Sequence, residues 1–164
     1  MIKIYLDINK MSQDPKVITS YCTNGLIKIL KKRLPFSVKV DEEITKAHPE
    51  WKNYFALNWD PFSDFPDDLI KDSKVILFFF NLSNKDSVDL LKDFQNFLKK
   101  KEEALKTCGA LYIIAQLVEG EKSLIDDSQI VEIAKKCNCK FEKIKDYKEI
   151  DSIFNKAIRE IYSI

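Results

Sequence analysis

Glycine and histidine are scarce in this 164-residue chain, and each scarcity excludes a kind of chemistry. Three glycines leave almost no room for the glycine-rich loop that wraps a phosphate in many nucleotide-binding proteins. The single histidine, His48, lies far in sequence from the Cys137-x-Cys139 pair, so the ligand spacing of a zinc site is missing. We expect no metal and no cofactor.

Charge of one sign and long apolar runs are also missing. The 27 Lys and Arg balance 26 Asp and Glu, so the net charge of +1 argues against a nucleic-acid binder that works by neutralising phosphates. The longest apolar run, residues 75–80, is too short to span a membrane. Residues 1–10 alternate apolar and polar side chains, unlike a signal peptide. We expect a reduced, intracellular protein without membrane insertion.

The composition that remains is that of one globular domain spanning residues 1–164. Hydrophobic residues make up 45% of the chain and charged residues 32%, which is enough apolar mass for a core. The length suits a single domain, and no linker or internal repeat is visible.

The second half of the sequence alternates buried strands with amphipathic helices. Strands are predicted at residues 75–82, 110–115 and 139–144, each followed by a helix. The helices begin at Asp86 or Ser87, at Asp126 or Asp127, and near Ile150, and the first runs to about Leu105. Apolar strands alternating with helices predict a three-layer α/β/α domain with a mostly parallel, six-stranded sheet.

The first half is predicted to supply the other strands. The segments are a strand at residues 2–8, a strand at 16–22, a helix at 26–34, a hairpin of 37–40 with 51–59, and a loop at 60–68. Asp14-Pro15 is also compatible with the start of a helix, and we favour the strand.

This order of elements resembles that of the Ras-like small GTPases. The most similar segments are residues 75–87, 130–141 and 150–161, and the resemblance covers nearly the whole chain. It implies a small-GTPase sheet topology. Binding of a guanine nucleotide would need four further motifs. In the first, a glycine-rich loop, main-chain N–H groups hold the phosphates, and a lysine and a hydroxyl serve the γ-phosphate and Mg²⁺.

All four motifs are replaced in this sequence. The glycine-rich loop is replaced by residues 22–25 (or, in another register, by 9–15), D-x-x-G by 60–63, N-K-x-D by 116–119 and S-A-K by 145–147. No nucleophile is paired with a base elsewhere in the chain. We therefore predict a pseudo-GTPase that is not an enzyme and has no catalytic residues.

Among nucleotide-free Ras-like proteins, the chain resembles the centromere protein M family through residues 17–30, 72–88 and 115–134. That resemblance implies a structural subunit of the inner kinetochore, in the nucleus, with centromere proteins I, H and K as partners. Residues 18–22 and the late strands are also similar to the p34-type chaperones of clathrin-adaptor assembly. A divergent Rab or Ras in membrane traffic is the third possibility, and both alternatives would place the protein in the cytoplasm.

An aromatic group is the candidate partner interface. Trp59, Phe62 and Phe65 flank the predicted loop after the hairpin, which carries partner binding in small GTPases. An exposed aromatic cluster would mark a protein interface. The competing hypothesis is that these rings pack into the core.

Overall fold

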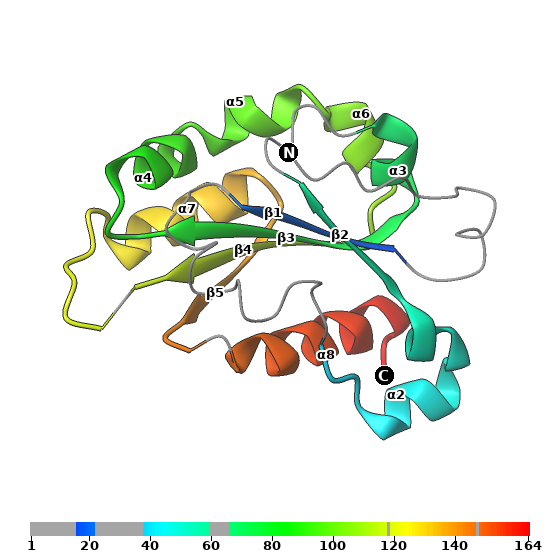
Figure 1. Ribbon diagram of the computed structural model, residues 1–164. Coiled ribbons are helices and arrows are strands. Elements are labelled where there is room, and N and C mark those ends of the chain that lie inside the picture. The colour runs from blue at the N-terminus through cyan, green and yellow to red at the C-terminus, as the bar shows by residue number, and fades with distance from the viewer. Residues whose placement is uncertain (1–15, 22–37, 60–65, 118, 147) are drawn as a thin grey trace.

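One parallel β-sheet forms the centre of the molecule (Figure 1). The computed structural model describes residues 16–21, 38–59, 66–117, 119–146 and 148–164. Its strands are β1 (Lys16–Tyr21), β2 (Phe55–Trp59), β3 (Ser73–Asn81), β4 (Ala110–Gln116) and β5 (Lys140–Ile144). All neighbours are parallel, in the order β2-β1-β3-β4-β5. This is a doubly wound order, with its switch point between β1 and β3.

Helices cover both faces of the sheet, which confirms the predicted α/β class (Figure 1). The helices are α2 (Glu42–Ala47), the 3₁₀ helix η2 (Pro49–Asn53), α3 (Asp67–Lys71), α4 (Lys85–Lys92), α5 (Phe94–Lys99), α6 (Glu102–Leu105), α7 (Asp127–Lys136) and α8 (Glu149–Tyr162). Helices α3 to α7 pack on one face, and α2, η2 and α8 pack on the other.

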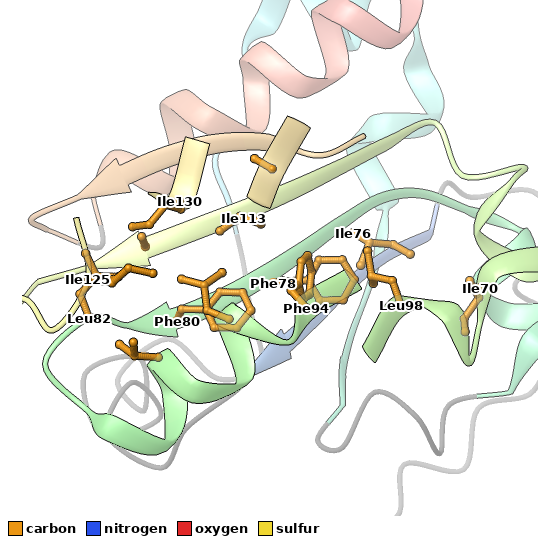
Figure 2. Packing of buried hydrophobic residues seen from close by; sticks show 14 of the residues in the cluster. Ile70, Ile76, Phe78, Phe80, Leu82, Phe94, Leu98, Ile113, Ile125 and Ile130 are labelled. Carbon is orange, nitrogen blue, oxygen red and sulfur yellow. The ribbon is translucent and has the colours of Figure 1, made fainter. Parts of the chain in front are cut away.

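Strand β3 is buried on both faces, as its unbroken apolar run predicts. Ile76, Phe78 and Phe80 point into the core beneath α4 to α7, and the residues between them point into the core beneath α8. Figure 2 shows the first of these cores. Phe94 packs edge-on against Phe78 and Phe80, with ring centroids 5.0 Å and 5.3 Å apart. Such contacts add about 0.5–1.5 kcal/mol each beyond area burial.

The helix predicted to run to about Leu105 is three short helices, α4, α5 and α6. Its amphipathic character is nevertheless kept, because Val88, Leu91, Phe94 and Leu98 are all buried in the same core. The predicted caps Asp86 and Ser87 lie inside α4 instead. Asn84 is the N-cap, since its side chain accepts a hydrogen bond from the Ser87 N–H.

A segment at residues 38–41 is tied to α8, although more than 100 residues separate them. The Asn155 side chain donates to the Lys39 carbonyl and accepts from the Asp41 N–H, both at 2.8 Å. Arg159 pairs with Asp41 at 3.0 Å. These contacts hold the residues before α2 against the C-terminal helix.

The predicted hairpin is wrong. Residues 38–40 form no strand, and most of the predicted connection is the helix pair α2 and η2. Strand β2 pairs in parallel with β1, with Ile18 opposite Leu57. A parallel neighbour requires a long crossover connection, whereas a hairpin pairs its two strands antiparallel.

The described residues therefore hold five parallel strands and not the predicted six of a small-GTPase sheet. The predicted strand at residues 2–8 and the predicted helix at 26–34 lie outside the described residues. No helix in the described part of the chain is both long and apolar enough to cross a membrane.

Candidate functional site

The carboxyl ends of the strands bring polar residues together at one edge of the sheet. Asn81 ends β3, Gln116 ends β4 and Ile144 ends β5, and pairing places these three side by side. Open α/β sheets bind ligands at this edge. A cleft of about 980 Å³ lies here, and we call it the carboxyl-edge cleft. Its lining residues are Gln116, Leu117, Glu119, Gly120, Glu121, Lys143, Ile144, Lys145, Asp146 and Glu149.

The turn after β3 is closed by its own side chains. The Asn81 N–H donates to Ser87 Oγ at 2.9 Å, and the Asn81 side-chain oxygen accepts from the Ser83 N–H at 3.0 Å. Asn84 caps α4 next to this network. The Ser83 hydroxyl also donates to Glu121, which links the turn to the loop after β4. These hydrogen bonds fix the conformation of the turn after β3, at the carboxyl edge of the sheet.

Gln116 is the buried polar residue of the cleft. It lies on the α8 side of the sheet, at alternate positions with Tyr112 and Ile114, and only 4% of it is exposed. Its main-chain carbonyl accepts a hydrogen bond from Leu82. Its side-chain amide forms no hydrogen bond with any residue in the described part of the chain. Buried amides are normally partnered, so this one points to a ligand or bound solvent.

Carboxylates dominate the rim of the cleft. Glu119, Glu121, Asp146 and Glu149 line it together with two lysines, Lys143 and Lys145. The Lys143 ammonium is bound to Asp127 at 2.9 Å, outside the lining. The cleft is therefore anionic, on a chain whose overall charge is close to zero.

Glu149 is the first residue of α8, and its side chain binds the loop that follows β5. Its Oε1 accepts hydrogen bonds from the N–H groups of Asp146 at 2.9 Å and Lys145 at 2.8 Å. These main-chain hydrogen bonds lower the pKa of Glu149, so its carboxylate is charged at neutral pH. The main-chain N–H groups of Lys145 and Asp146 could otherwise have donated to a bound anion, but both already donate to Glu149.

The chemistry of this edge suits a cationic or neutral ligand with hydrogen-bond donors. A phosphate would meet repulsion from the rim. Among the described residues, no group of three or more His, Cys, Asp or Glu side chains is placed to hold a metal ion. Burial raises the pKa of Cys108 to about 11 and that of Cys139 to about 12, as expected for packed, unreactive thiols.

The predicted interface residues are only partly reached by the structure. Trp59 is the last residue of β2, and Phe62 and Phe65 lie outside the described residues. Their role in partner binding stays a prediction. The nearby Trp51 belongs to the core, because it is 1% exposed and its indole N–H donates to the Tyr162 hydroxyl at 3.1 Å.

In the sequence, Gln116 stands out only as part of the segment that replaces the guanine-reading motif. The available signal was a polar residue ending an otherwise apolar strand. The His48 ring stacks on Tyr162, with ring centroids 3.7 Å apart.

Comparisons with known proteins give no family for this chain. No protein-family model matches it, and no curated protein matches its sequence.

Proposed function

We propose that this chain is a non-catalytic protein-binding domain, a pseudo-GTPase that serves as a structural subunit of a multiprotein complex. One observation carries the proposal. The sheet edge where a nucleotide would be expected is lined by carboxylates, and Glu149 takes the N–H groups of the loop after β5. Phosphate binding needs free main-chain N–H groups, and Glu149 already accepts hydrogen bonds from those of Lys145 and Asp146.

The order of the later elements supports the pseudo-GTPase proposal. Three units, each a strand followed by one or more helices, run from β3 to α8, as in the resemblance. The hairpin is the departure, because its place is taken by a parallel strand. A domain that keeps this framework without the nucleotide-binding groups would act through its surface, by binding other proteins.

The inner kinetochore is the complex we propose, with centromere proteins I, H and K as partners, and the protein would then be found in the nucleus. The support is the sequence resemblance at residues 17–30, 72–88 and 115–134. Affinity purification of the tagged chain from its own cells, followed by mass spectrometry, tests this. Inner-kinetochore subunits at comparable stoichiometry support it. Clathrin-adaptor subunits, or exchange factors and effectors, overturn it and place the protein in membrane traffic in the cytoplasm.

The loss of nucleotide binding has its own test. Purified chain is titrated into fluorescent GDP and GTP analogues with Mg²⁺, and the denatured protein is analysed for co-purified nucleotide by chromatography. We expect no saturable binding at micromolar protein and no released nucleotide. Stoichiometric GDP or GTP in the denatured sample would refute the pseudo-GTPase proposal.

A further inference from the structure

We propose that the carboxyl-edge cleft binds an arginine side chain presented by a partner protein. This inference rests on the proposed function and names the chemistry that the partner must bring. Its basis is the combination of an anionic rim with one buried amide that has no hydrogen-bond partner among the described residues, on a chain of nearly neutral charge.

The amide of Gln116 needs both a donor and an acceptor. Its oxygen can accept an N–H, and its NH₂ group can donate to a carbonyl. An arginine-bearing peptide supplies both kinds of group, since the guanidinium carries five N–H donors and the main chain carries carbonyls. Binding would thus satisfy a group that folding leaves buried at 4% exposure.

The rim selects the charge of the ligand. Glu119, Glu121 and Asp146 line the cleft together with Glu149, whose lowered pKa keeps it ionised. Glu121 is also oriented by the Ser83 hydroxyl, so one carboxylate is held in place before a ligand arrives. A carboxylate accepts a guanidinium through two parallel hydrogen bonds.

Arginine fits these groups better than lysine does. The guanidinium is planar and presents its donors in a fixed fork, which can reach an amide oxygen and a carboxylate together. A lysine ammonium is a compact, strongly hydrated charge that loses more on entering a cleft. An acidic peptide or a nucleoside phosphate would meet like charges at the rim.

The test is a titration of ¹⁵N-labelled chain with a nona-arginine peptide, followed by NMR. A nona-lysine peptide of the same charge is the comparison. We expect saturable shifts of the Gln116 side-chain NH₂ and the Gly120 N–H, with affinity for nona-arginine several-fold above that for nona-lysine. The variant Gln116→Met should weaken nona-arginine binding at least about tenfold, because hydrogen bonds to a charged group are lost. Glu121→Gln should weaken it as well.

A matched control separates this site from general attraction to carboxylates. Glu132 is an exposed carboxylate of α7 that pairs with Lys136, away from the cleft. Glu132→Gln should bind nona-arginine like the parent chain. Shifts that map elsewhere, or equal binding by Gln116→Met and the parent, overturn the arginine site and leave the proposed function standing. Micromolar GDP binding to the same labelled chain overturns the proposed function itself.

Discussion

Replacing Gln116 by Met should stabilise the ligand-free protein. Met keeps the length and approximate volume of Gln, so the exchange creates no large cavity. What it removes is an amide that is buried without a hydrogen-bond partner among the described residues. Such a group costs about 1–3 kcal/mol, and we expect the free energy of unfolding to rise by about 1 kcal/mol or more. For a chain of this length the melting temperature should rise by about 2–4 °C.

Asn155 provides the matched control, because it is a buried amide whose hydrogen bonds are all made. It is 7% exposed, donates to the carbonyls of Lys39 and Asp151, and accepts from the Asp41 N–H. Asn155→Leu removes three hydrogen bonds and leaves main-chain groups of the segment at residues 38–41 without partners. At about 1 kcal/mol for each bond, we expect a loss of about 3 kcal/mol.

Urea denaturation followed by tryptophan fluorescence measures both variants, with the melting temperature from calorimetry as a second readout. Equal slopes for parent and variants would show that the midpoints report stability. If Gln116→Met loses as much stability as Asn155→Leu, the Gln116 amide is partnered in the folded protein. The carboxyl-edge cleft would then hold no buried amide in need of a ligand.

Three further predictions concern packing and thiol chemistry. Gly109→Ala should destabilise the protein by about 1–3 kcal/mol in urea denaturation. The new Cβ would lie 2.6 Å from the main-chain carbonyl oxygen of Lys74, so the backbone there must shift. An unchanged urea midpoint would contradict that geometry. At pH 8 an alkylating reagent should modify Cys137 faster than Cys139, as measured by peptide mass spectrometry. The reason is that burial raises the pKa of Cys139 to about 12 and keeps it a neutral thiol. Equal rates of modification would refute this prediction. Phe94→Ala should lower the free energy of unfolding by about 3–5 kcal/mol in the same denaturation assay, because a fully buried ring is lost. A loss below about 1 kcal/mol would show that neighbouring side chains repack into the space.

The central strands and the last two helices could be predicted because their signals are local and strong. The apolar side chains of β3 are all removed from water only when both faces of the strand are covered. Helix α8 repeats its apolar residues at helical spacing over its whole length. Asp126 caps α7 as predicted. These features depend on a few neighbouring residues, so the sequence alone identifies them.

The hairpin could not be excluded from the sequence, because alternation of side chains identifies a strand and not its neighbour. Helix α2 has six residues and buries only Ile44, which is too little for a periodic signal. The site was missed for a similar reason. Whether the amide of Gln116 meets a partner depends on what three strands and two loops place around it, and no local pattern reports that.

The ties between α8 and the segment at residues 38–41 have a consequence for how the chain folds during synthesis. Trp51, Val75 and Tyr112 bury their side chains against a helix that begins only at Glu149. Until that helix emerges from the ribosome, α2 and η2 are the only described helices on that face of the sheet, and the residues before α2 lack their contacts with α8. A nascent chain that stops before residue 149 would leave apolar side chains of that face exposed, which is the kind of surface that chaperones bind.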